Sequence, residues 1–397
     1  MSESLGGSIG GSIGGSIGGS IGGSIGGSIG GSIGGSIGGS ILSDAFATPL
    51  YAEAMIRHRA ASIDLGGEPV LWDVADRRGR DSRLFHWDPW VRSYLIAQEL
   101  IRPMDFESGT GETASLTLNV FGSNDGKLDA TPRPLVTLIG PRTEVFEQQV
   151  SQVLDWSELR EERMPEILAQ METQHCFWGS VIPIHTDRMK STRELLEAAV
   201  RMAVFVEMRF KHELAAWRPI DYSPQVQPLI TTPGHGATPS GHCTESYVIY
   251  EVLKALLDTK DTDAGRRAMN RQFSHIAERV SINRVVAGVH FPVDNVAGRL
   301  LGTVLGEYMV HRCVGDDSPC HFGRFDGLLY AAEDGFNPVT QWMFAPGPNR
   351  VRPAYYTHYD PLPTLDRPGP SRLLRALWDK AMAEVVELGL RFDRAES

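Results

Sequence analysis

Long apolar runs, cysteine pairs and an excess of basic residues are all missing from this sequence of 397 residues. No stretch of about 18 apolar residues runs without a charge, so we expect no transmembrane helix. The net charge of -11 argues against a general nucleic-acid binder, because affinity for a phosphate backbone needs a basic surface. Any anion site must therefore be a local concentration of positive charge.

Cysteine is scarce, and the four thiols are scattered without a CxxC pair. Cys313 and Cys320, followed by His321, leave a metal site as a minor alternative, although a fourth ligand and the usual short spacing are missing. Reduced thiols are the better interpretation. The chain begins Met-Ser-Glu-Ser, without a basic start followed by an apolar block, so we expect no secretory signal and a cytoplasmic location.

Glycine is concentrated at the N-terminus, where nine copies of Gly-Gly-Ser-Ile run from Gly6 to Ile41. Because glycine loses much backbone entropy on folding, we expect residues 1–42 to be a disordered tail. An isoleucine at every fourth position leaves a stacked solenoid as the alternative. Residues 43–397 then form one folded domain, with a helix that starts near Ser43 or Asp44.

Apolar residues at spacings of three and four dominate the chain after Pro141. Helices are expected from Val145 to Leu154 and at about 160–172, 191–216, 242–258, 264–286, 293–312 and 370–390. Residues 63–140 suggest loops, short helices and a small hairpin, and residues 318–369 an irregular wrap. The expected fold class is all-α, a helical bundle with ligands between facing helices. Its buried faces can close within one chain or against a second copy.

Three segments carry the unusual polar residues, and the first places Lys211 and Arg218 seven positions apart before Pro219. Seven residues are two helical turns, so both cations are expected on one face of a helix that Pro219 ends. Taken alone, this segment is better explained as a solvated cationic stripe.

The second segment, Pro239-Ser240-Gly241-His242, stands directly before an apolar helix. Ser240 can act as N-cap, and the free amides of Gly241 and His242 then make an anion site at the positive end of the helix. His242 supplies a proton donor or acceptor. An ordinary capped helix with a surface histidine is the competing interpretation.

The third segment contains Asn283, Arg284, His290, Pro292 and Asp294. Pro292 suits the first turn of a helix, so His290 is expected at a junction between two helices. Asp294 is near enough to hold one ring nitrogen of His290, which leaves the other nitrogen as nucleophile or metal ligand.

Together the segments resemble the signature of the superfamily that contains type 2 phosphatidic acid phosphatases (PAP2), class A acid phosphatases and vanadium-dependent haloperoxidases. The signature is a lysine, six residues and Arg-Pro, then Pro-Ser-Gly-His, then Ser-Arg, five residues, His, three residues and Asp. The matching residues are Lys211, Arg218, Pro219, Pro239, Ser240, Gly241, His242, Arg284, His290 and Asp294. Asn283 replaces the usual serine, and the match spans residues 211–294.

The resemblance implies a role for each matching residue. Lys211, Arg218 and Arg284 would surround the oxygens of a phosphate or vanadate, and Ser240 and Gly241 would add neutral donors. His242 would be the acid–base residue. His290, oriented by Asp294, would bond the phosphorus or vanadium atom.

Two chemistries use such a site, and the resemblance favours the haloperoxidase, in which His290 holds vanadate while peroxide and halide react. The long chain, the absence of membrane spans and the sequence Trp217-Arg218-Pro219 look like that branch. His235 stands where bromoperoxidases have an extra active-site histidine, although a plain loop histidine explains it equally well. A phosphatase without a cofactor, acting on phosphate esters through a phosphohistidine, is the alternative, and a non-catalytic oxyanion-binding module is the third. Glu245 is expected to lie on the exposed surface of its helix rather than bind a substrate amine.

Overall fold

The computed structural model describes residues 49–62, 84–110, 114–124, 127–171, 174–258, 264–315, 318–341, 343, 352–363 and 367–391. The predicted tail (1–42) and the expected helix start at Ser43 or Asp44 lie outside these ranges. Helix α5 (Pro49–Ser62) comes first, and its side chains from residue 53 to 62 are exposed. The apolar core therefore begins later, with the buried side chain of Leu84.

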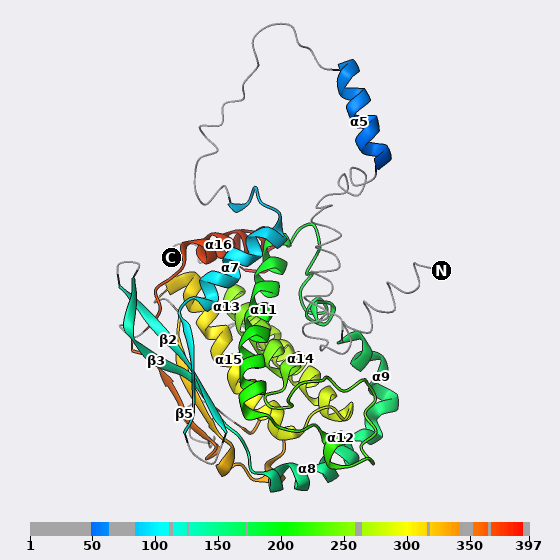
Figure 1. Ribbon diagram of the computed structural model, residues 1–397, viewed down its shortest axis with the longest axis vertical. Helices are drawn as coiled ribbons and strands as arrows, with labels where there is room; N and C mark the ends of the chain where they lie inside the picture. Colours follow the sequence, from blue (N-terminus) through cyan, green and yellow to red (C-terminus); the bar gives the residue numbers. More distant parts are fainter. Residues whose placement is uncertain are drawn as a thin grey trace.

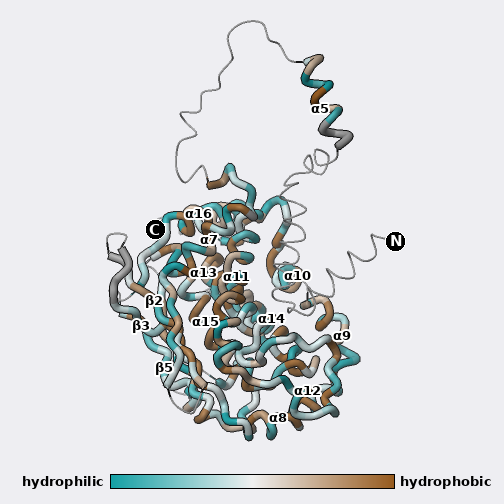
Figure 2. Tube along the Cα trace, viewed as in Figure 1, coloured by the Kyte–Doolittle hydropathy of each residue, from teal (hydrophilic) through white to brown (hydrophobic). Residues whose placement is uncertain are grey.

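Helices form most of the described structure, in the places that apolar periodicity predicts (Figure 1). The remaining α-helices are α7 (Pro89–Ile101), α8 (Thr143–Trp156), α9 (Arg160–Ala169), α10 (His175–Trp178), α11 (Lys190–Leu214), α12 (Pro219–Tyr222), α13 (Gly241–Leu256), α14 (Ala264–Val286), α15 (Pro292–Val314) and α16 (Arg372–Glu387). Short 3-10 turns are η3 (Ser157–Leu159), η5 (Gly327–Leu329) and η6 (Ala332–Asp334). Figure 2 shows apolar residues recurring along α11 and α15.

A sheet of five strands makes the fold mixed α/β, and the all-α prediction is wrong. The strands lie in the order β1 (Met104–Ser108), β2 (Ser115–Asn124), β3 (Lys127–Ile139), β4 (His321–Asp326) and β5 (Tyr356–Pro361). All neighbours are antiparallel except β3 and β4, which pair in parallel from Val136 opposite Gly323 to Ile139 opposite Asp326. The hairpin expected within residues 63–140 is present as β2 and β3, but the supposed wrap of residues 318–369 supplies two more strands.

The sheet covers one side of the helices because its strands alternate buried and less buried side chains. Leu116, Leu118 and Val120 of β2 are fully or almost fully buried, and β2 packs against α11 while β4 packs against α15. In Figure 1 the strands stand beside α11 and α15. This layer buries a face of those two helices that a plain bundle would have left to other helices.

Three glycines of α15 bring it into close contact with α13. A Cβ atom at Gly302 would lie 2.3 Å from the Thr244 carbonyl oxygen, and one at Gly298 would lie 2.7 Å from the Ser240 carbonyl oxygen. At Gly306 it would lie 2.5 Å from the Glu251 Cβ atom. The missing side chains let the two backbones approach, which fixes the first turn of α13 beside the first turn of α15.

The last helix, α16, holds the start of α11. The Glu384 carboxylate accepts hydrogen bonds from the Ser191 and Thr192 amides at 2.7 and 2.8 Å. These amides belong to the first turn of α11, whose positive end favours a carboxylate. Within the described ranges, every helix is too short or too polar to cross a lipid bilayer.

Candidate active site

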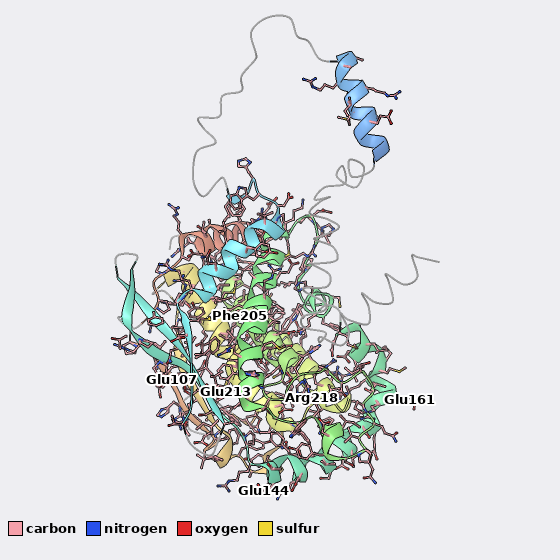
Figure 3. All side chains as sticks on the ribbon, in the orientation of Figure 1. Glu107, Glu144, Glu161, Phe205, Glu213 and Arg218 are labelled. Carbon is pink, nitrogen blue, oxygen red and sulfur yellow. The ribbon has the colours of Figure 1, made fainter. Side chains whose placement is uncertain are left out.

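The three polar segments of the sequence meet in one buried place. Lys211 lies near the end of α11, Arg218 directly before α12, Ser240 directly before α13, Arg284 near the end of α14 and His290 directly before α15. Each of these side chains is at most 4% exposed. Figure 3 labels Arg218 among the side chains at the α12 end of the molecule. Most of these residues stand at helix ends, so their positions depend on how the helices pack.

Lys211 directs its ammonium group at the backbone of the second segment. Its Nζ atom donates to the Pro239 carbonyl oxygen and, at 3.3 Å, to that of Ala237. Burial lowers the pKa of Lys211, and the nearby Glu207 carboxylate opposes that shift. The cation is thus tied to the loop that leads into α13.

Arg218 does not lie on the same helix as Lys211, so that part of the prediction is wrong. Helix α11 ends at Leu214, and Ala215 takes a left-handed backbone with φ of 45°. Arg218 is extended, and Pro219 begins α12 instead of merely ending the previous helix. The two cations meet through a turn in the chain, not through helical spacing.

The guanidinium of Arg218 is the best connected group of the site. Its Nη1 atom donates to the Val289 carbonyl oxygen at 2.7 Å and lies 3.0 Å from His290 Nε2. Its Nε and Nη2 atoms donate at 3.1 Å to the carbonyl oxygens of His235 and Gly236. Burial lowers the pKa of Arg218 to about 10, which leaves the group charged at neutral pH.

His290 and Asp294 form the contact that their spacing predicts. His290 Nδ1 lies 3.1 Å from Asp294 Oδ2, which also accepts from the Phe291 amide at 2.8 Å. The other oxygen of Asp294 accepts from the Thr238 hydroxyl. Because Nδ1 donates to the carboxylate, Nε2 keeps a lone pair, and Arg218 donates to it. Burial, followed by the charges of Arg218 and Lys211, holds the pKa of His290 well below its ordinary value.

Ser240 is the N-cap of α13, as predicted, but its hydroxyl does not cap the helix. The Oγ atom is buried without a hydrogen-bond partner among the described residues, while the Ser240 amide donates to the Asp294 carbonyl oxygen at 2.9 Å. This amide joins the second and third segments. The free hydroxyl remains available as a donor to a ligand.

His242 lies in the first turn of α13 and is 9% exposed, so the surface-histidine interpretation is wrong. Its Nε2 atom is 3.2 Å from the Gln170 carbonyl oxygen, which can only accept. The neutral ring therefore carries its proton on Nε2 and has a lone pair on Nδ1. Burial and the charge of Arg284 hold the pKa of His242 well below its ordinary value.

Arg284 has unused hydrogen-bonding capacity. Its Nη2 atom donates to Gln170 Oε1 at 2.7 Å and to the Ile167 carbonyl oxygen at 3.3 Å. The Nε and Nη1 atoms are buried and have no partner in the part of the chain that the structure describes. Burial lowers the pKa of Arg284 to about 10, so a permanent cation with two spare donors stands in the site.

His235 belongs to the site through Arg218. Its Nδ1 atom lies 3.1 Å from Arg218 Nη2, which always donates, and 3.1 Å from the Gly236 carbonyl oxygen, which can only accept, so the two contacts favour opposite tautomers of the ring. The Nε2 atom is buried without a partner among the described residues. Burial and the charges of Lys211 and Arg218 lower the pKa of His235 to about 3. A histidine of an open loop would not be held in this way.

A cleft of about 600 Å³ adjoins these residues, lined by Trp217, Thr232 and Pro233 as well as His235 and Arg218. The indole of Trp217 is 68% exposed, although it stands next to an arginine that is 3% exposed. The cleft opens beside the buried cations Lys211 and Arg218. It offers an aromatic wall to an entering molecule.

Sequence reasoning missed Gln170 and Glu207 and misjudged Glu245. Gln170 is 1% exposed and contacts Arg284 and His242, but its position in the sequence carries no signal. Glu207 stands one helical turn before Lys211, a spacing that offered a clue. Glu245 is 2% exposed, so the expectation that it lies on the exposed surface of its helix is wrong.

The cysteine alternative receives no support from the structure. Cys313 and Cys320 are buried, and burial raises the pKa of each thiol to about 12. Across the described ranges, no group of three or more His, Cys, Asp and Glu side chains is arranged to hold a metal ion.

Comparison with known proteins identifies the region that contains the site. The family model described as "PAP2 superfamily" matches residues 195–316, which include every residue of the predicted signature. A search of curated proteins found no match. The resemblance to this superfamily is therefore confirmed for residues 195–316.

Proposed function

We propose that the protein is a vanadium-dependent haloperoxidase that oxidises halide with hydrogen peroxide. The observation that carries the proposal is a buried set of donors with spare hydrogen bonds beside two neutral histidines. Among the described residues, Ser240 Oγ and the Nε and Nη1 atoms of Arg284 have no hydrogen-bond partner. Burying such atoms costs free energy unless a ligand satisfies their hydrogen bonds. A tetrahedral oxyanion accepts hydrogen bonds in many directions, so these residues fit vanadate.

The proposed cofactor site uses His290 as the ligand. Its Nε2 atom carries the lone pair, and Asp294 fixes the ring by accepting from Nδ1. Lys211, Arg218 and Arg284 would neutralise the oxygens, while Ser240 would donate its hydroxyl proton. When bound, vanadate supplies the oxidation of halide by peroxide, which no side chain performs.

His242 would move the proton that peroxide loses. Its Nδ1 lone pair is free at neutral pH because burial and Arg284 keep the ring uncharged. A base of this kind accepts a proton from hydrogen peroxide. His235 Nε2 is buried without a hydrogen-bond partner among the described residues, so in the tautomer that carries its proton there the ring would be a further donor toward the same region.

Two features favour the haloperoxidase over the phosphatase. The side chains proposed to surround the anion are nearly closed to solvent, which suits peroxide and halide better than a phosphate ester. They are Lys211, Arg218, Ser240, Arg284 and His290. A phosphatase needs a protonated His242 to release the leaving group, and here its pKa is held low. The phosphatase remains the second candidate because the same donors would fit phosphate. A non-catalytic oxyanion module is the third.

One purified sample tests all three candidates. Half is loaded with orthovanadate and given peroxide, bromide and a phenol, and the other half receives a chromogenic phosphate ester with and without vanadate. Bromination of the phenol without ester hydrolysis is the expected result. Vanadate-inhibited hydrolysis without bromination would instead establish the phosphatase, and anion binding without either reaction would establish the module.

Replacing His290 by alanine should abolish turnover, because it removes the atom proposed to hold the cofactor. Circular dichroism should show the helices of the wild type, and the loss should exceed about a thousandfold, as for other residues bonded to a reacting centre. A His58→Ala variant is the matched control, since His58 is exposed on α5. Bromination by His290→Ala at the wild-type rate would refute the assignment.

A further inference from the structure

Two buried glutamates lie beside the proposed anion site without the hydrogen-bond partners that buried carboxylates normally have. Glu207 of α11 is fully buried, and a Cβ atom at Gly241 would stand 2.6 Å from its Oε1 atom. Neither carboxyl oxygen of Glu207 has a hydrogen-bond partner within the described residues, and Oε1 of Glu245 has none either. Glu245 lies one turn after Gly241 on α13, and its Oε2 atom accepts from Gln174 Nε2 at 3.0 Å. The Glu207 carboxyl therefore lies against Gly241, and its charge acts on the carboxyl of Glu245.

The charges around this pair come from every element of the site. The cations that act on it are Lys211 of α11, Arg218 of the connecting loop and Arg284 of α14. The groups around those cations are His235, His242, His290 and Asp294. With the histidines neutral, these are three cations and one carboxylate. If Glu207 and Glu245 were both ionised, they would cancel the remaining positive charge. The site would then have no net electrostatic attraction for a dianion.

Burial opposes that cancellation because it favours the neutral carboxyl form. It raises the pKa of Glu207, and it raises the pKa of Glu245 well above its ordinary value, with the neighbouring charge of Glu207 adding to the effect. A protonated carboxyl also has an O–H to donate, whereas a carboxylate can only accept. An anion that lies against Gly241 offers acceptor oxygens to such a donor.

We propose that Glu207 and Glu245 form a proton-holding pair that couples oxyanion binding to proton uptake, with the Glu207 carboxyl donating its O–H to the anion at Gly241. One proton passes from solvent to the pair for each anion bound, and no covalent bond changes. This inference rests on the proposed oxyanion site but not on the reaction performed there. Under this proposal, the site binds an anion only when the Glu207 carboxyl is protonated.

Sulfate is the probe, because its double charge is constant over the range from about pH 6 to about pH 8, where a carboxyl with a raised pKa titrates. Isothermal titration in two buffers of different ionisation enthalpy counts the protons. We expect the wild type to take up about one proton per sulfate and to lose affinity by up to about tenfold per pH unit.

Glu207→Gln separates this role from a structural one. The carboxamide keeps the shape and carries its donor permanently, so the proton uptake should disappear. Its sulfate affinity should exceed that of the wild type by about tenfold at about pH 8, where the wild type must first bind a proton. At about pH 6 the two affinities should agree. A merely structural carboxyl would not give a tighter binder at high pH.

Glu213→Gln on the same helix is the matched control, because Glu213 is half exposed and Figure 3 shows it apart from Arg218. It should bind sulfate as the wild type does. Should Glu207→Gln unfold, the wild type itself gives the test, because its proton uptake should fall from about one at about pH 8 towards zero at about pH 6, where the carboxyl is already protonated. Equal proton counts in the wild type and Glu207→Gln, or a wild-type count of zero at about pH 8, would overturn the pair. Sulfate that fails to bind the wild type at every pH would overturn the oxyanion site itself.

Discussion

The lone pair of His290 Nε2 is covered by Arg218 in this structure. The guanidinium that donates to it at 3.0 Å also donates to the carbonyl oxygens of Val289, His235 and Gly236. An incoming anion must therefore draw one Nη1 hydrogen away from the ring while the other bonds hold the arginine in place. In the proposed site, Arg218 would both shield His290 Nε2 and donate to the anion.

Arg284→Lys should weaken vanadate binding by about tenfold or more. The guanidinium contacts Gln170 through Nη2 and keeps Nε and Nη1 for a ligand, whereas one ammonium group cannot serve both directions. Loss of a hydrogen bond to a charged group costs about 1.5–3 kcal/mol, which sets that expectation. Titration with vanadate measures it. Arg271→Lys, at an exposed position of the same helix, is the control, and equal affinities in the two variants would contradict the prediction.

The contribution of His235 to the free energy of unfolding should be lost as the pH is lowered from 6.5 towards about 3. The pKa of His235 is about 3 in the folded protein against 6.5 ordinarily, so the unfolded chain binds more protons in this window. His242 and His290 act in the same direction. Denaturant unfolding at several pH values should show a smaller slope for His235→Gln than for the wild type. Identical slopes would mean that His235 is not held neutral by the fold.

Local spacing predicted the residue contacts that lie within one or two turns, and no others. The His290–Asp294 contact and the N-cap position of Ser240 follow from neighbours in the sequence. The left-handed turn at Ala215 breaks the expected helical relation between Lys211 and Arg218. Gln170 joins the site only through tertiary packing, which a single sequence does not encode visibly, whereas Glu207 stands one helical turn before Lys211.

At the scale of elements, helices were predictable and most of the sheet was not. The long helices each bury an apolar face of their own, so their periodicity is visible in any window of the sequence. Strand β4 has six residues and pairs with β3, so that Val136 lies opposite Gly323, about half of the domain away in sequence. A strand this short, buried by partners from both ends of the chain, carries too little alternation to be recognised.

Gly302→Ala should destabilise the protein by about 1–3 kcal/mol, the usual cost of overpacking a core. The new methyl group would meet the Thr244 carbonyl oxygen at 2.3 Å and push α15 from α13. Denaturant unfolding measures the loss. Gly234→Ala is the control, because a Cβ atom there meets nothing within 4 Å, and its change should stay within about 0.5 kcal/mol. Equal stabilities for the two variants would show that the helices can separate at no cost.

At the scale of the whole molecule, one apolar cluster joins the sheet and the helices. It contains Ile96 of α7, Leu118 of β2, Trp178 of α10, Val304 of α15 and Val385 of α16. Residues from the first described core helix to the last therefore share one interior. The site stands at the edge of this interior, where α11, α13, α14 and α15 end or begin.

We expect the folded region to unfold in a single transition, because no separate core exists for the sheet among the described residues. Far-ultraviolet circular dichroism reports the helices, and tryptophan fluorescence reports the buried Trp178 and Trp378. The two midpoints in denaturant should coincide. Two separate midpoints would show that the folded region does not unfold as one unit.

The parallel pairing of β3 with β4 also sets an order of events during synthesis. Synthesis proceeds at about 5–20 residues per second. Residues 136–139 therefore leave the ribosome long before their partners at 323–326. Until then the β3 edge has no neighbour on that side, and an open edge invites pairing with another chain. The nascent protein thus passes through an interval of many seconds in which it is prone to aggregate, and a chaperone that shields this edge would raise the yield of active molecules.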